Sequence, residues 1–230
     1  MRYRCEATSL EGFIQILASN YLPHGYWFYV TGLVPEGKDP QSVDRKLIEK
    51  YEIALSRQQR ARRKKAGLAN LQYVRIGPLF VLLATHGRHR FFDDEGTCVR
   101  DIRKYPLQVG GYSLTVRRGD FLKKAAGERQ AVVDHRYRVR VQIGRERYRE
   151  LMAYFLEIAT HRRAEALARE FWNVPFEPYA PIRKQLLQIL RRVNAKRSAM
   201  GYEKLSPDVI RYRRKIVCPF GDLASDARAA

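Results

Sequence analysis

The chain has 230 residues, of which 44 are Lys or Arg and 24 are Asp or Glu, so its formal net charge at pH 7 is +20. Its 45% hydrophobic and 11% aromatic residues can build a core, which excludes a wholly disordered basic tail. The three cysteines are far apart, which excludes a disulfide framework and a zinc knuckle. The longest apolar run, 79–84, is far shorter than the roughly 20 residues that span a bilayer. We expect a cytoplasmic protein without a membrane partner.

The first predicted elements are a short helix, a strand and a long helix. Ser9 precedes an apolar-periodic segment that ends near Asn20, which predicts a short helix. Residues 25–34 are aromatic and β-branched and predict a strand. Apolar residues recur at helical spacing from Val43 to Leu55, and Gly67 is a natural residue to follow a helix, so a long helix is predicted from 41 to about 66. Its last ten residues have no apolar face, so we expect them to project into solvent or to become ordered on a partner.

Strands dominate the middle of the chain. Residues 71–85 predict a strand that is broken at Gly77-Pro78, because proline cannot donate to a central ladder. Further strands are predicted at 90–92, 111–117 and 131–143.

Helices dominate the last third. One helix is predicted from Gly144 through Phe171 and another from 182 to 200, after a run of prolines. This order favours an α+β fold, a ferredoxin-like antiparallel sheet with long helices on one face, plus a C-terminal helical extension. We expect a nucleic-acid-binding core at 1–172, the extension at 173–220 and a disordered tail at 221–230.

The positive charge is unevenly distributed. Residues 1–50 carry equal numbers of basic and acidic side chains, so the whole excess lies beyond residue 50. Arg supplies 32 of the 44 basic residues, and the guanidinium group matches phosphate oxygens better than an ammonium group does. Solubility requires a net charge of only about 2 to 8 and does not explain clustering. The sequence therefore favours DNA or RNA as the partner.

Alternating arginines form the sharpest basic pattern. In a strand, Arg136, Arg138 and Arg140 would share one sheet face, while Tyr137 and Val139 would face the core. Guanidinium groups about 7 Å apart roughly match the phosphate spacing of an extended strand. We expect this ladder to follow a nucleic-acid backbone.

Further basic clusters extend the predicted binding surface, and Tyr212 is placed to stack on a base. With the ladder, the predicted nucleic-acid-binding residues are Arg57, Arg60, Arg62, Arg63, Lys64, Lys65, Arg136, Arg138, Arg140, Arg145, Arg147, Arg211, Tyr212, Arg213, Arg214 and Lys215. Trp27 and Trp172 are interpreted as core residues rather than stacking platforms.

Two histidines follow the most hydrophobic predicted strand. His86 and His89, with acidic residues just beyond them, have the chemistry to hold a divalent metal. With the order of elements over residues 25–171, they resemble HUH-type single-strand nucleases and small transposases. That resemblance implies a ferredoxin-like core, a histidine pair as metal ligands and a tyrosine nucleophile on a later helix, for which Tyr154 is the better placed candidate. The family pair is His-hydrophobic-His, whereas here two residues separate the histidines. A regular strand would send them to opposite faces, unless Gly87 makes a bulge or the pair lies in a turn.

The sequence is compatible with three functions. The first is a nucleic-acid-binding protein without a cofactor, encoded by or derived from a mobile element. The second is a metal-dependent endonuclease or strand transferase that uses His86, His89 and Tyr154 with Mg²⁺ or Mn²⁺. The third is an RNA-assembly factor in a larger nucleoprotein complex. Charge does not distinguish DNA from RNA, or single strands from duplexes.

Overall fold

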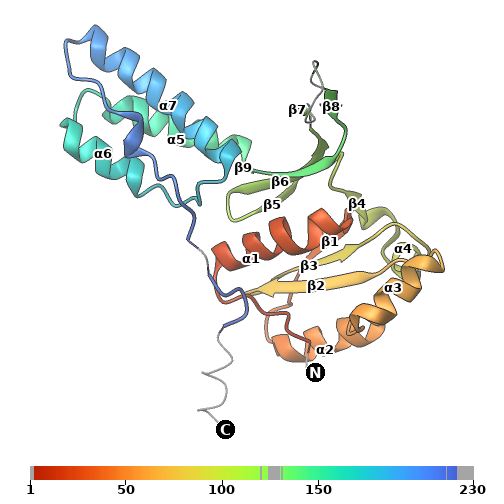
Figure 1. Cartoon of the computed structure of the whole chain (residues 1–230). Helices are drawn as coiled ribbons and strands as arrows, with labels where there is room; N and C mark the ends of the chain where they lie inside the picture. Colours follow the sequence, from red (N-terminus) through yellow and green to blue (C-terminus); the bar gives the residue numbers. More distant parts are fainter. Residues whose placement is uncertain (1–2, 120, 124–129, 131, 216, 222–230) are drawn as a thin grey trace. The chain divides into compact units, whose positions relative to one another are not determined.

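The computed structural model describes residues 3–119, 121–123, 130, 132–215 and 217–221, and the chain forms two units (Figure 1). Unit 1 comprises Met1–Pro106, Thr115–Val139 and Val217–Ala230, and unit 2 comprises Leu107–Leu114 and Arg140–Ile216. Most of the predicted tail, 222–230, lies outside the described residues. Among the described helices, none is both long and apolar enough to cross a bilayer.

Unit 1 holds most of the strands. Its elements are α1 (Leu10–Ile16), a π-helical turn (Leu17–Tyr21), a 3-10 turn (Leu22–His24), β1 (Phe28–Leu33), α2 (Pro40–Lys50), α3 (Arg57–Lys65), β2 (Leu71–Ile76), β3 (Leu79–Ala84), α4 (Arg90–Glu95), a 3-10 turn (Gly96–Cys98), β4 (Arg100–Asp101), β7 (Phe121–Lys123) and β8 (Val132–Asp134).

Unit 2 is mainly helical. It holds β5 (Leu107–Val109), α5 (Arg145–Ile158), α6 (Ala164–Trp172), α7 (Ala180–Ala199) and a 3-10 turn (Pro207–Val209). Strands β6 (Tyr112–Arg118) and β9 (Tyr137–Ile143) have residues in both units. The fold is therefore mixed α and β with antiparallel sheets.

The main sheet of unit 1 has the strand order β2-β3-β1-β4. β3 pairs antiparallel with both β1 and β2, and β4 pairs antiparallel with β1. Gly77 and Pro78, where the sequence predicts a break, make the tight turn between β2 and β3, so the segment is two strands rather than one kinked strand. The remaining strands form the sheets β5-β6-β9 and β7-β8.

Both faces of the main sheet are buried. On one face, Leu71, Tyr73 and Leu82 pack with Tyr51 and Phe91 in a hydrophobic cluster. On the other face Val74, Val81 and Leu83 are fully buried, and α1 lies along that side (Figure 1). Helices therefore cover both faces of this sheet, rather than one face as the order of elements predicts.

The long helix predicted at 41–66 is wrong, because the chain breaks it into α2 and α3. Tyr51 and Ile53 are both buried, and Glu52 between them has a φ of 49°. Ser56 then starts α3 with a capping box, in which its side chain accepts from the Gln59 backbone N–H and the Gln59 side chain accepts from the Ser56 N–H. Burial of Tyr51 and Ile53, together with the capping box at Ser56, is therefore more favourable than one continuous helix through this segment.

Two other predicted elements are also interrupted. The helix predicted from Gly144 through Phe171 ends at Ile158, and the buried Arg197 side chain donates to the backbone oxygens of Ala159 (2.7 Å) and Arg162 (3.1 Å) just beyond that end. The strand predicted at 131–143 is two strands, separated by His135 and Arg136, which belong to neither, and its first residue lies outside the described part of the chain.

Candidate functional site

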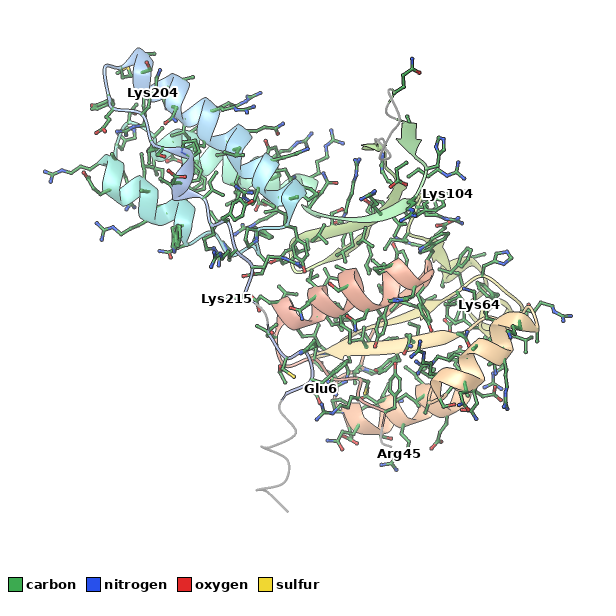
Figure 2. The ribbon with its side chains drawn as sticks, viewed as in Figure 1. Glu6, Arg45, Lys64, Lys104, Lys204 and Lys215 are labelled. Atoms are coloured by element: carbon green, nitrogen blue, oxygen red, sulfur yellow. The ribbon has the colours of Figure 1, made fainter. Side chains whose placement is uncertain are left out.

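Helix α3 is a basic helix that buries none of its residues. Its anchors are backbone contacts: the capping box at its start and the Asn70 side-chain amide, which donates to the Arg60 carbonyl oxygen at 3.0 Å. Within the described part of the chain, Arg63 is the one cation of α3 with a carboxylate partner, Glu52, at 2.7 Å. Figure 2 labels Lys64, whose side chain extends into solvent near the end of this helix. The helix is therefore held in place while four of its six cations, Arg57, Arg62, Lys64 and Lys65, stay exposed.

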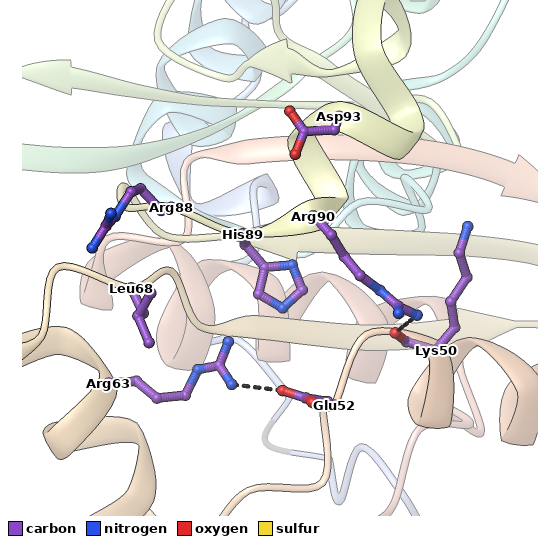
Figure 3. Close-up of a pocket in the computed structure, with 8 residues that line it drawn as sticks. All are labelled: Lys50, Glu52, Arg63, Leu68, Arg88, His89, Arg90 and Asp93. Atoms are coloured by element: carbon purple, nitrogen blue, oxygen red, sulfur yellow. Dashed lines mark hydrogen bonds and ion pairs between the residues drawn. The ribbon is translucent and has the colours of Figure 1, made fainter.

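An open hollow of about 560 Å³ lies beside this helix (Figure 3). It is lined by Lys50, Glu52, Arg63, Leu68, Arg88, His89, Arg90 and Asp93. Four of these residues are Lys or Arg and two are carboxylates, so the lining is net positive. The hollow and the exposed cations of α3 form the basic surface of unit 1, which we call the α3 surface.

His89 starts α4 and faces this hollow. Its Nδ1 accepts a hydrogen bond from the Phe91 backbone N–H at 3.1 Å, so the neutral ring carries its proton on Nε2. Burial, followed by the nearby charge of Arg63, lowers the pKa of His89 below its usual value. Figure 3 shows the ring directed toward Arg63 and Glu52. His89 is therefore a neutral donor at physiological pH.

His86 has a different environment. It is exposed in a bend after β3, and its ring centroid lies 6.4 Å from that of Phe28. The His89 ring instead lies 6.2 Å from Tyr51. In the described part of the chain, no group of three or more His, Cys, Asp or Glu side chains is placed to hold a metal ion. Both histidines lie beyond the end of β3, which is followed by a bend at His86 and Gly87. They are therefore not on a regular strand, and the opposite-face arrangement expected for a strand does not occur.

Gly87, between the histidines, packs against backbone. Its φ is +139°, and a Cβ there would lie 2.5 Å from the Ala69 nitrogen and 2.6 Å from the Leu68 carbonyl carbon. We expect Gly87→Ala to lower the free energy of unfolding by about 3 kcal/mol, because it combines backbone strain with overpacking. Gly37 is the control: its φ is +77° and a Cβ there would meet no atom within 4 Å. Gly37→Ala should cost about 1 kcal/mol. Urea unfolding measures both, and equal losses would contradict the close packing.

Tyr154, the predicted nucleophile, lies on α5 in unit 2, whereas both histidines belong to unit 1. The side chain is 39% exposed. Burial and then a hydrogen bond with Glu170 raise its pKa above the usual value. A raised pKa keeps the phenol protonated, which is opposite to the activation that a nucleophile requires.

The predicted arginine ladder is only partly a strand. Arg136 precedes β9, and its backbone N–H donates to Asp134 Oδ1 at 2.9 Å, which turns the chain there. Arg138 is exposed and pairs with Asp134 Oδ2 at 2.5 Å, and Arg140 is half-buried. Tyr137 is 40% exposed rather than in the core, so that part of the prediction is wrong.

The basic cluster at 211–215 contains both residues with structural contacts and residues that are exposed. Arg211 is half-buried and donates to the backbone oxygens of Val174 (3.0 Å) and Phe176 (2.8 Å), so its guanidinium group ties two segments of unit 2 together. Tyr212 is 73% exposed, and the guanidinium carbon of Arg183 lies 4.1 Å from its ring centroid.

Five predicted basic residues of unit 2 are exposed: Arg145, Arg147, Arg213, Arg214 and Lys215. Among these, Arg147 pairs with Glu150 at 2.8 Å, and the guanidinium carbon of Arg214 lies 4.5 Å from the Tyr179 ring centroid.

Sequence reasoning missed two sets of residues. The first set is Arg88 and Arg90, which flank His89 and line the hollow. The arginines next to the histidines in the sequence could have indicated a basic site there. The second set, which we call the Trp27 stack, consists of Trp27, Tyr137, Arg103 and Arg118. Its members are far apart in the sequence, so no local pattern indicates it. Trp172, interpreted as core, is 52% exposed.

Comparison with family models, with curated proteins and with solved structures found no match to this chain.

Proposed function

We propose that this protein binds nucleic acid, gripping the phosphate backbone of DNA or RNA with the α3 surface. The observation that carries this proposal is α3 itself: a helix with no buried residue, anchored through its backbone, with six cations of which one has a carboxylate partner among the described residues. A helix with no apolar face contributes nothing to the core, so core packing does not explain it. Clustered Arg and Lys are the usual phosphate contacts of DNA- and RNA-binding proteins.

The hollow beside α3 supports the same function. Arg88 is exposed at its rim, and Arg63 and neutral His89 add N–H donors to the lining. Fixed guanidinium groups and a neutral imidazole donor suit phosphate oxygens, which only accept hydrogen bonds. The net charge of +20 strengthens attraction to a polyanion at long range.

The topology of unit 1 supports a ferredoxin-like core as part of the proposal. Helices α2 and α3 lie between β1 and β2 in the chain, and α4 lies between β3 and β4. With the strand order β2-β3-β1-β4, this is the β-α-β-β-α-β order of ferredoxin-like domains. An origin in a mobile element, as the resemblance to HUH-type nucleases implies, is consistent with such a core.

A tyrosine-dependent nuclease is less well supported. The pKa of Tyr154 is raised, and His89 already accepts a backbone hydrogen bond at Nδ1. An RNA-assembly factor would use the same basic surfaces and would differ by preferring one folded RNA. A general nucleic-acid-binding protein and an RNA-assembly factor are therefore distinguished by the substrate they prefer, because both would use the same residues.

Direct binding measurements test the proposal. We expect nuclease-treated protein to bind labelled single-stranded DNA, duplex DNA or structured RNA with an affinity that falls steeply between 50 and 200 mM salt, because several phosphates release counterions (about 10³-fold for six contacts). With Mg²⁺ or Mn²⁺ present, a denaturing gel should show neither cleavage nor a covalent adduct, and Tyr154→Phe should bind as the native protein does. The absence of salt-dependent binding would refute the proposal. An adduct lost in Tyr154→Phe would establish the nuclease instead.

A further inference from the structure

The Trp27 stack brings together two aromatic rings, whose planes are tilted by 52°, and two guanidinium groups in unit 1. The ring centroids of Trp27 and Tyr137 are 4.7 Å apart. The guanidinium carbon of Arg103 lies 4.7 Å from the Trp27 centroid, and that of Arg118 lies 5.4 Å from the Tyr137 centroid. Both distances are within the range of cation–π attraction.

Hydrogen bonds hold the base of this stack. The Trp27 indole N–H donates to the Leu22 carbonyl oxygen at 3.0 Å, and the Trp27 carbonyl oxygen accepts from the Ile102 N–H at 2.9 Å. Arg103 makes a two-pronged pair with Asp101, with Nε at 2.9 Å from Oδ1 and Nη2 at 2.7 Å from Oδ2. Trp27 and Arg103 therefore keep their positions without a ligand.

The outer layer of the stack is open to solvent. Tyr137 is 40% exposed, although its ring packs on Trp27. The side chains of Arg117, Arg118, Arg136 and Arg138 are exposed as well. Lys104, next to Arg103 in the chain, marks this part of the molecule in Figure 2.

The nearby carboxylates do not cancel this charge. Asp101 is occupied by Arg103, and the buried Asp134 is occupied by Arg138 and by the Arg136 backbone N–H. Arg117 and Arg118 have no carboxylate partner among the described residues, and Arg136 and Arg138 share the single carboxylate of Asp134, so this surface stays net positive around the exposed Tyr137. An aromatic ring backed by another ring and bordered by guanidinium groups is the surface on which unstacked bases bind, whereas a duplex hides its base faces.

We propose that the Trp27 stack binds an unpaired base of single-stranded nucleic acid, with Tyr137 as the stacking surface and Arg118, Arg136 and Arg138 on the flanking phosphates. This inference rests on the proposed function and specifies its substrate class. It also gives the predicted Arg136 and Arg138 contacts a role that does not require a regular strand ladder.

An abasic oligonucleotide separates stacking from charge, because it keeps the phosphates and lacks the bases. We expect the native protein to bind a single-stranded 12-mer about tenfold more tightly than the matching abasic 12-mer, at equal salt. Tyr137→Leu should reduce this preference to less than about threefold, while the slope of affinity against salt stays unchanged. Fluorescence anisotropy measures both quantities.

Tyr202→Leu is the matched control, because Tyr202 is also exposed (48%) and lies beside an arginine, Arg197, but belongs to unit 2. It should retain the full preference for bases. A second readout uses Trp172→Phe, which leaves Trp27 as the only tryptophan of the chain. The tryptophan fluorescence of this variant, which then comes from Trp27 alone, should change when the normal 12-mer is added and should not change when the abasic 12-mer is added.

The two proposals fail in different ways. If the native protein binds none of the oligonucleotides, the proposed function itself is refuted. If it binds normal and abasic strands equally, or a duplex as tightly as a single strand, backbone binding stands and the stacking inference is overturned. Loss of the preference in Tyr202→Leu as well as in Tyr137→Leu would also overturn it.

Discussion

Asp44→Asn should lower the free energy of unfolding by about 3 to 5 kcal/mol, which is the usual cost of removing one partner of a buried ion pair. Asp44 is 6% exposed and Arg75 is 2% exposed. Arg75 Nε lies 2.9 Å from Asp44 Oδ1, and the same oxygen accepts from the Tyr73 hydroxyl at 2.6 Å. The substitution leaves the guanidinium group without its buried countercharge. For a chain of this size the melting temperature should fall by about 10 °C.

Glu6→Gln is the matched control, because Glu6 pairs with the same arginine at 3.0 Å but its side chain is 57% exposed. Solvent screens this pair, so its loss should cost less than about 1 kcal/mol. Urea unfolding at pH 7 measures both variants. Similar losses for Asp44→Asn and Glu6→Gln would show that the buried pair contributes no more than the exposed one.

The double substitution Arg62→Gln/Lys65→Gln should weaken nucleic-acid binding about tenfold near 100 mM salt and reduce the slope of log affinity against log salt by about 2. The two residues are one helical turn apart on α3, and both are exposed. Neither has an ion-pair partner among the described residues, so stability should change by less than about 0.5 kcal/mol. Binding is measured on the preferred substrate across a salt series.

Arg45→Gln/Lys46→Gln removes the same charge from the exposed side of α2, which lies in the electrically neutral first 50 residues. This control should change affinity by less than about threefold. Equal effects of the two double substitutions would mean that net charge, rather than the α3 surface, drives binding.

Local signals in the sequence were sufficient where the structure depends on near neighbours. Ser9 caps α1 by accepting from the Gly12 N–H at 3.1 Å, and Gly77-Pro78 divides β2 from β3. The Gly110-Gly111 turn joins β5 to β6 with positive φ at both residues. Each of these outcomes follows from the backbone preferences of a few adjacent residues.

The same local reasoning failed where distant parts of the chain compete with it. Helical spacing of apolar residues continues through Leu55, but burial of Tyr51 and Ile53 ends α2 at Lys50, and Ser56 then starts α3. The alternation around Tyr137 predicts a core position, but Trp27, more than 100 residues earlier in the chain, supplies a half-exposed packing surface.

The sequence by itself determined that this chain folds, that its excess charge lies beyond residue 50 and that α3 carries a dense basic segment, because these properties depend on composition and short-range pattern. Only the tertiary structure decided which cations are available: it placed Arg211 and Arg75 in structural contacts, left most cations of α3 without a carboxylate partner among the described residues, and assembled the Trp27 stack. The reason is that availability depends on burial and on partners brought together by the fold, and local sequence contains neither.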